Sequence, residues 1–168
     1  MKAIVAAASD WGIGYEGQLL QWIPEDMKFF KAKTLQKVVV MGRTTFESLP
    51  GKAPLKDRIN IVLSKRQEKP HDAVILCRSL PELWEELKQY NTNDIFVIGG
   101  ASVYHSLLPY CSEAYVTKIF ADYQADKYFD NLDTAQEWKL VETSEMHVYK
   151  ELSFQFTKYE NQQILVPK

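Results

Sequence analysis

The sequence predicts one α/β domain: an eight-stranded, mostly parallel mixed sheet flanked by four helices, with an antiparallel C-terminal strand pair. Short runs rich in β-branched residues alternate with helical segments, which is typical of strands joined by helical crossovers. Several runs, such as VVVM at 38–41 and INIVL at 59–63, are continuously apolar, as strands covered on both faces are. The chain has 168 residues, enough for one hydrophobic core. We therefore expect a single domain over residues 1–168.

Eight segments show the strand pattern between turn residues. They are Ala3–Ala8, Lys37–Met41, Arg58–Leu63, Ala73–Cys77, Asp94–Ile98, Ala114–Phe120, Lys139–Glu145 and Phe154–Tyr159. The last two alternate between apolar and polar residues more than the others do. This alternation indicates an antiparallel pair near one edge of the sheet.

Two helices have clear start signals. Pro24–Thr34 begins with a proline followed by acidic residues, which suit the first turn of a helix. Ser79 and Glu82 have the spacing of a capping box, so we expect a helix over Leu80–Gln89. Two shorter helices are expected directly after the glycine-containing ends of two strands, as described below.

Composition and charge exclude several classes of function. Twenty basic side chains against 22 acidic ones give no positive field for nucleic acid, and no apolar run has membrane-spanning length. Cys77 and Cys111 have no partner at metal or redox spacing, so we expect buried, inert thiols in a reducing cytoplasm. His71, His105 and His147 are scattered, so no metal site is expected. The remaining class is a cytoplasmic protein that binds small molecules.

Two strands run directly into glycine and then into a helix, in VVVMGRTTF and IFVIGGASVY. A glycine there lets the backbone approach a ligand, and the helix start behind it offers free N–H groups. We call these two strand–glycine–helix segments glycine elbows. Their presence favours a phosphate-bearing cofactor held at the carboxyl ends of the strands. Neither segment matches the G-x-G-x-x-G fingerprint. The alternative is that each glycine only separates a strand from the following helix and contacts no ligand. The helix after Gly100 should end near Pro109.

Basic residues follow two of the predicted strands. Arg43 comes directly after the first elbow, and Ser64, Lys65 and Arg66 follow the INIVL strand. Three cations and a hydroxyl at strand ends can hold a dianionic phosphate such as the 2′-phosphate of NADPH. A solvated basic turn is the alternative interpretation.

One face of the first helix combines an acid with apolar side chains. Asp26, Met27, Phe30 and Thr34 share this face by helical spacing. A buried carboxylate is costly without a partner, and a planar group with two parallel N–H donors would be one. The alternative is an acid that stabilises the helix start, a role that suits Glu25 better.

A glycine-rich stretch at 10–17 lies between the first strand and this helix. Its three glycines are compatible with a mobile segment that closes over a ligand. A passive surface loop is the alternative.

Taken together, these segments resemble dihydrofolate reductases over nearly the whole chain. The resemblance is carried, in order, by IVAAAS, GIG, IPEDMKFFKAKT, VVVMGRTTFESL, INIVLSK, DIFVIGGASVY and VTKI. It implies a monomer that reduces 7,8-dihydrofolate to 5,6,7,8-tetrahydrofolate with NADPH, by hydride transfer to C6 and solvent-assisted protonation of N5. Two other functions stay open: a related NADPH-dependent pterin or flavin-precursor reductase, and a catalytically weakened binder of folate and NADPH.

The resemblance implies roles for the substrate-binding residues. Asp26 would be the lone active-site carboxylate, holding the 2-amino and N3 side of the pterin, and Thr117 would hydrogen-bond to it. Arg58 would pair with the α-carboxylate of the glutamate tail. Phe30 and Leu55 would flank the pterin and p-aminobenzoyl rings. The rest of the pterin and nicotinamide pocket would be lined by Ile4, Leu49, Ile98 and Tyr104.

The resemblance also implies the cofactor-binding residues. The nicotinamide end would be contacted by Ala6, Ile13, Gly14 and Leu19. The adenosine half and its phosphates would be held by Gly42, Arg43, Thr44, Thr45, Leu63, Ser64 and Lys65. The pyrophosphate side would be formed by Gly99, Gly100, Ala101, Ser102, Val103 and Tyr104. In the family the two consecutive glycines are joined by a cis peptide.

One stretch departs from the family pattern. The family has Asn-x-Leu-Pro-Trp where this chain has Gly17-Gln18-Leu19-Leu20-Gln21, so Leu20 stands at the usual proline, Gln21 at the usual tryptophan and Trp22 one position later. Either the loop shifts by one residue to bring Trp22 into the pocket, or Gln21 takes the place of the tryptophan. A glutamine amide can hydrogen-bond a water near the substrate carbonyl oxygen, but it offers less apolar surface.

Overall fold

The structure, a computed structural model, describes all 168 residues. Its strands are β1 (Lys2–Ala7), β2 (Gly12–Tyr15), β3 (Gln18–Leu19), β4 (Val38–Gly42), β5 (Ile59–Leu63), β6 (Ile75–Cys77), β7 (Ile95–Gly99), β8 (Glu113–Ile119), β9 (Lys127–Tyr128), β10 (Trp138–Thr143), β11 (His147–Tyr149) and β12 (Leu152–Asn161). Its helices are α1 (Pro24–Thr34), α2 (Arg43–Ser48), α3 (Leu80–Leu87) and α4 (Ala101–Leu107), with single 3₁₀ turns at Pro50–Lys52, Thr92–Asp94 and Leu108–Tyr110.

The predicted elements are confirmed. All eight expected strands are present, with ends shifted by at most two residues, and α1 has the expected bounds. Helix α3 ends at Leu87, two residues earlier than expected. Its capping box forms, because Ser79 Oγ accepts a hydrogen bond from the Glu82 N–H. The Glu82 carboxylate bonds the N–H of Arg78 instead of that of Ser79.

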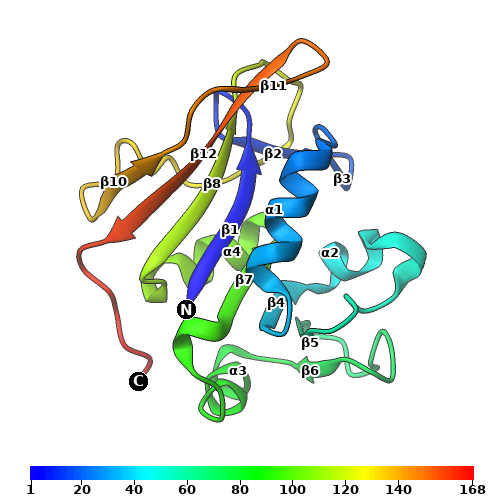
Figure 1. Cartoon of the computed structure of the whole chain (residues 1–168). Helices are drawn as coiled ribbons and strands as arrows, with labels where there is room; N and C mark the ends of the chain where they lie inside the picture. Colours follow the sequence, from blue (N-terminus) through cyan, green and yellow to red (C-terminus); the bar gives the residue numbers. More distant parts are fainter.

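The main sheet has the strand order β10-β12-β8-β1-β7-β4-β5-β6, with β11 paired to β12 (Figure 1). The five pairings from β8 through β6 are parallel. Strand β12 pairs antiparallel with β8, β10 and β11, so the C-terminal strands close the sheet as expected. The order places the carboxyl ends of β1, β4, β5 and β7 along one edge of the sheet.

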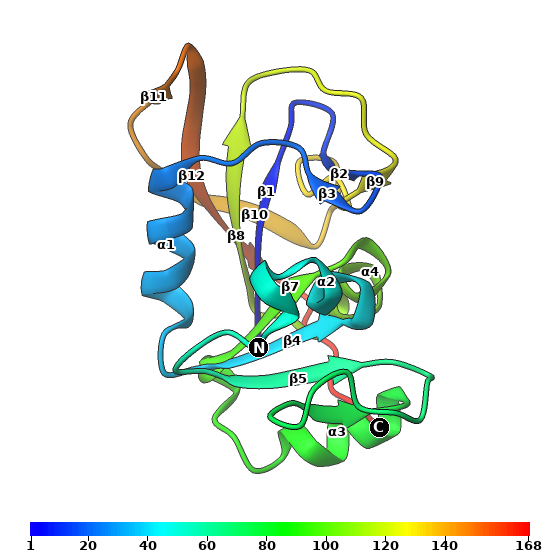
Figure 2. The same ribbon diagram turned by 90° about the vertical axis from the view of Figure 1, so that its right-hand side faces the viewer.

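Two helices cover each face of the sheet. Figure 2 shows α1 on one side of the central strands β1 and β8 and α4 on the other. Alternation along the strands divides the core accordingly. Val39 and Met41 of β4 pack with Phe46 of α2, whereas Val38 and Val40 pack in the cluster that contains Leu107 of α4.

The glycine-rich stretch is more ordered than a loop. Strands β2 and β3 form a hairpin, and β2 also pairs with β9 in a separate three-stranded sheet. The Asp126 carboxylate accepts the N–H of Glu16 at 3.0 Å, and the Asp126 N–H bonds the Gly14 carbonyl at 3.0 Å. Strands of two to four residues are too short for their alternation to predict them from sequence.

The two cysteines are free and buried, as expected. Burial raises the pKa of the Cys77 thiol to about 11 and that of Cys111 to about 12, so both carry their protons and are poor nucleophiles at neutral pH. No helix in the structure has the length and apolarity required to cross a bilayer.

The packing of α4 gives a first prediction. Leu107 is fully buried in the larger core cluster, so Leu107→Ala should lower the free energy of unfolding by roughly 2–5 kcal/mol. Leu140 on β10 is 42% exposed, and Leu140→Ala should cost less than about 1 kcal/mol. Urea denaturation of the three proteins measures both values. Equal losses for the two variants would contradict the described core.

Candidate active site

The candidate site begins with an acid on the first turn of α1. The side chain of Ile23, which is 1% exposed, anchors the start of this helix in the core. Asp26 then faces β8, where Thr117 Oγ1 donates a hydrogen bond to Asp26 Oδ1 at 2.6 Å. The neighbouring Glu25 is exposed to solvent. Residues 91 positions apart in the chain are thereby fixed against each other.

The surroundings of Asp26 favour its protonated form. Burial raises the pKa of Asp26 above its ordinary value, and the hydrogen bond from Thr117 opposes this rise by stabilising the carboxylate. No basic side chain forms an ion pair with Asp26. Tyr104 is fully enclosed, and its hydroxyl donates to the Ile4 carbonyl at 2.7 Å. Burial raises the pKa of this phenol, so it is neutral and acts as a donor.

The apolar residues that the sequence analysis expected near Asp26 lie together. Ile4 belongs to the smaller core cluster, on the face of the sheet that carries α1 and α2. Partly buried side chains pack against this cluster and come from α1, from the end of α2, from the segment before β5 and from β7. They include Phe30, Leu49, Leu55 and Ile98.

These side chains form the apolar wall of the candidate site, and Arg58 lies beside it, next to Phe30. Its guanidinium carbon is 5.9 Å from the centre of the Phe30 ring, and its Nη1 donates to the Lys56 carbonyl at 3.1 Å. Its Nε is buried and has no hydrogen-bond partner, and burial lowers the pKa of the guanidinium. An unused N–H of this kind is suited to a carboxylate, because a guanidinium binds carboxylates through two parallel N–H groups.

Asn60 fixes this segment and was missed by sequence reasoning. Its buried side chain donates to the carbonyls of Leu55 and Arg58 and accepts the Leu55 N–H at 2.9 Å. One side chain thus holds the backbone at two expected substrate-binding residues. An asparagine inside the apolar INIVL strand was the available signal, since buried amides need several hydrogen bonds.

The two glycine elbows lie side by side. Strands β4 and β7 are neighbours, with Met41 opposite Gly99, and the Gly99–Gly100 peptide is cis, as expected. Gly99 has a φ of +128°, and a Cβ on it would meet the Tyr104 ring and Thr45 Oγ1 at 3.4 Å. A larger residue at Gly99 is therefore strained, and the protein packs closely against the backbone of both elbows, since a Cβ at Gly42 would also meet Val103 at 3.2 Å.

A cavity of about 270 Å³ lies beyond the carboxyl end of β5. It is lined by Leu63, Ser64, Lys65, Arg78, Ser79, Leu80, Ser102, Val103 and Ser106. Five of these were expected to bind the cofactor. Arg78, Ser79, Leu80 and Ser106 were missed, although Arg78 follows a strand just as Lys65 does. Two cations and four hydroxyls around one cavity fit a phosphate group.

Arg43 does not line this cavity but holds Ser64, which does. Its Nε donates to Ser64 Oγ at 2.8 Å, and its Nη2 bonds the Glu68 carbonyl. It therefore ties the start of α2 to the segment after β5. Thr44, Lys65 and Ser102 are exposed at the surface of the same edge, and Thr45 faces the glycines.

The remaining expected cofactor residues lie near the β2–β3 hairpin. Ala6 is on β1, and Ile13 and Gly14 on β2 are partly buried. Leu19 on β3 is 65% exposed, so its side chain is free of the core.

The segment before α1 keeps Gln21 inward and Trp22 outward. Gln21 is partly buried, and its Oε1 accepts a hydrogen bond from the Tyr123 hydroxyl at 3.4 Å. Trp22 is 57% exposed. Of the two arrangements considered from sequence, the one in which the loop shifts to bury Trp22 is not adopted.

Comparison with known proteins gives one consistent family. The dihydrofolate reductase family model matches residues 1–161. The dihydrofolate reductase of Buchnera aphidicola subsp. Acyrthosiphon pisum is 38% identical over 141 residues, covering 84% of this chain and 85% of that protein. That of Bacillus subtilis is 33% identical over 133 residues, covering 79% and 76%. A solved dihydrofolate reductase from Enterococcus faecalis, complexed with NADP(H) and RAB-propyl, superposes with a TM-score of 0.84 at 32% identity, covering 95% of both chains.

The buried Asp26 carboxyl predicts a pH-dependent cost to stability. Its pKa in the folded chain lies above the ordinary 3.8. As the pH rises from about 3.8 through the folded pKa, the unfolded chain releases this proton first, so stability is lost. Asp26→Asn removes the loss, because an amide does not ionise. The variant should unfold at a higher temperature than the wild type at pH 7, and the difference should shrink toward pH 3.

Glu25→Gln, on the exposed side of the same turn, is the matched control for this thermal unfolding series. It should leave the pH dependence unchanged. A wild type more stable than Asp26→Asn at pH 7, or a difference that grows as the pH falls, would show that Asp26 is not a destabilising buried acid.

Proposed function

Because the chain belongs to the dihydrofolate reductase family and catalyses the NADPH-dependent reduction of dihydrofolate to tetrahydrofolate, we propose that Asp26 binds and orients the pterin. The observation that carries this proposal is the carboxyl group of Asp26, buried on the inner face of α1 and held by Thr117 Oγ1 at 2.6 Å. A pterin offers an amino group and a ring nitrogen side by side, and a carboxyl can pair with both.

The apolar wall and Arg58 define the rest of the substrate site. Phe30, Leu55 and their neighbours provide flat apolar surface for the pterin and p-aminobenzoyl rings. Arg58, with its buried and unpartnered Nε, is placed to pair with the α-carboxylate of the glutamate tail. Asn60 keeps Leu55 and Arg58 in position through its three hydrogen bonds to their backbones.

The residues at the glycine elbows fit NADPH. The cavity beside Ser64, Lys65 and Arg78 would take the phosphate on the adenosine half, and the backbone at Gly42 and Gly99–Gly100 would approach the pyrophosphate. When bound, NADPH supplies the hydride that reduces the pterin. Ala6, Ile13 and Gly14 would enclose the nicotinamide end and exclude water from it.

Asp26 controls protonation without delivering the proton to N5 itself. Burial holds its proton to a higher pH than an exposed aspartate would keep it. We assign the protonated carboxyl to the reactive state, with solvent supplying the proton at N5. Reduction should therefore slow as the pH rises through the pKa of Asp26. Gln21, held by Tyr123, stands where the family has tryptophan and can hydrogen-bond a water at this end of the pocket.

The monomeric state, which the resemblance implies, stays a prediction. So do the single domain, expected from the length of the chain, and the cytoplasmic location, expected from its two isolated cysteines. The main sheet contains both β1 and β12, and all three hydrophobic clusters include residues of its strands, which supports the single domain.

The first functional prediction concerns Asp26→Asn. The amide keeps the shape of the side chain and removes its acid, so turnover of dihydrofolate should fall by roughly 10²–10⁴-fold. Affinity for NADPH, measured by fluorescence titration, should stay within about twofold, since Asp26 lies outside the residues assigned to the cofactor. Glu25→Gln is the control and should keep full activity. Unchanged turnover in Asp26→Asn would refute the assignment of Asp26, whereas a wild type that binds both ligands without turnover would indicate the weakened binder.

The second functional prediction concerns the cofactor phosphate. Lys65 lines the cavity at the end of β5, so Lys65→Gln should raise the KM for NADPH by roughly tenfold. NADH lacks the 2′-phosphate, and its KM should not change. Lys139→Gln, an equivalent charge change on the exposed face of β10, should alter neither value. Equal effects on NADPH and NADH would show that Lys65 does not contact the 2′-phosphate.

A further inference from the structure

A second groove lies on the sheet face that carries α1, outside the site described above. Its volume is about 510 Å³, within the range of sites for small molecules. It runs between α1 and strands β8, β12 and β10. The side chains that decide its chemistry are Phe29, Lys33, Tyr115, Glu142, Phe156 and Lys158. None of them is assigned to dihydrofolate or NADPH.

Three aromatic rings form one wall of this groove. The rings of Phe29 and Phe156 are stacked, with centres 4.5 Å apart and planes at 24°. The ring of Tyr115 meets that of Phe29 edge-on, with centres 6.1 Å apart. Helix α1 thus packs on β8 and β12 through aromatic contacts, and the groove opens beside them. Such a wall favours a flat aromatic ligand.

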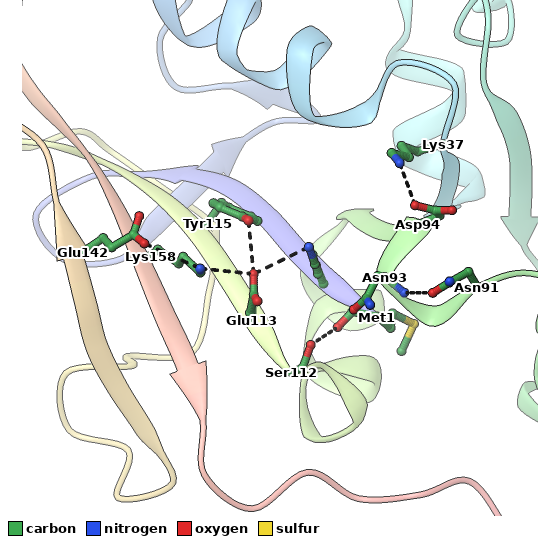
Figure 3. A network of polar contacts seen from close by, with 11 residues as sticks. Met1, Lys37, Asn91, Asn93, Asp94, Ser112, Glu113, Tyr115, Glu142 and Lys158 are labelled. Atoms are coloured by element: carbon green, nitrogen blue, oxygen red, sulfur yellow. Dashed lines mark hydrogen bonds and ion pairs between the residues drawn. The ribbon is translucent and has the colours of Figure 1, made fainter.

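The charged groups around the groove leave one ammonium without an acidic partner. Figure 3 shows the carboxylate of Glu113 between Lys158 and Tyr115, with Glu142 on the other side of Lys158. Lys158 Nζ is 3.7 Å from each carboxylate, and Lys2 Nζ is also 3.7 Å from Glu113. The two carboxylates therefore balance the charges of Lys2 and Lys158.

Lys33 is the additional positive charge. Its Nζ lies 4.7 Å from the centre of the Tyr115 ring and 5.6 Å from that of Phe29, and it forms no ion pair with any carboxylate. Its ammonium is held over the aromatic wall by cation–π attraction. An acidic ligand group at this position would pair with Lys33 without displacing an internal partner.

We propose that the groove between α1 and β8–β12–β10 is a binding site for a planar aromatic anion. The ring system lies against Phe29, Tyr115 and Phe156, and the acidic group binds the ammonium of Lys33. The excess of one cation over the local carboxylates selects a ligand with a single negative charge over neutral or cationic aromatics.

The probe for this site is 8-anilino-1-naphthalenesulfonate, which combines an aromatic system with one negative charge. The protein is first saturated with NADP⁺ and folate, so that the catalytic site is filled. Fluorescence titration should then give saturable binding of one probe per chain. In ¹H–¹⁵N spectra, the shifts should centre on the amides of Phe29, Lys33, Tyr115 and Phe156. The neutral analogue N-phenyl-1-naphthylamine should bind at least roughly tenfold more weakly, because it cannot pair with Lys33.

Variants of α1 test the role of Lys33 directly. Lys33→Gln should weaken binding of the sulfonate roughly tenfold or more and leave binding of the neutral analogue unchanged. Lys33→Arg keeps the positive charge and should therefore keep the affinity for the sulfonate. Lys31→Gln, on the exposed side of the same helix, removes an equal charge and should have no effect.

Three results would overturn the proposal. They are the absence of saturable binding, spectral shifts centred elsewhere, and equal losses in Lys33→Gln and Lys31→Gln. If Lys33→Gln fails to fold, the comparison of the charged and neutral probes on the wild type decides the question. Equal affinities for those two probes would then refute the site.

Discussion

The hydrogen bond between Thr117 and Asp26 is the contact on which the rest of the site depends. An acid in apolar surroundings is costly to ionise, and this chain gives Asp26 one hydroxyl and no cation. Its position is set by packing: Ile23 anchors the start of α1, and the stacked rings of Phe29 and Phe156 seat the helix on the sheet. Because β8 pairs with β1 and β12, Thr117 is held on a strand with partners on both sides.

The end of the site assigned to the cofactor follows from the parallel part of the sheet. Neighbouring parallel strands end at one edge, so β4, β5 and β7 bring two glycine elbows and a basic segment together. The Gly99 backbone, with its positive φ, passes close to Thr45 and Tyr104, and Tyr104 in turn bonds the Ile4 carbonyl on β1. Residues assigned to the cofactor and residues assigned to the substrate are therefore linked through one buried phenol.

Much of this arrangement could be predicted from the sequence. Continuous apolar runs located the central strands, and the proline and acids of Pro24–Thr34 located α1 within its true bounds. The pairing of Asp26 with Thr117 came from the family resemblance, because no local pattern links residues 91 positions apart. The β2–β3–β9 sheet was missed because its strands are two to four residues long. Arg78 and the groove beside Lys33 were missed because a lone arginine or lysine in a sequence looks like solvated surface, whereas Asn60 carried a signal as a polar residue inside an apolar strand.

The pH dependence of turnover in Thr117→Val shows whether the hydroxyl of Thr117 controls the ionisation of Asp26. The hydroxyl of Thr117 stabilises the ionised carboxyl, so its removal should raise the pKa of Asp26 further. The pH at which hydride transfer begins to fall should therefore shift upward in Thr117→Val. Asp26→Asn should show no such fall in its residual activity. A pH profile in Thr117→Val that coincides with the wild type would show that this hydrogen bond does not set the ionisation of Asp26.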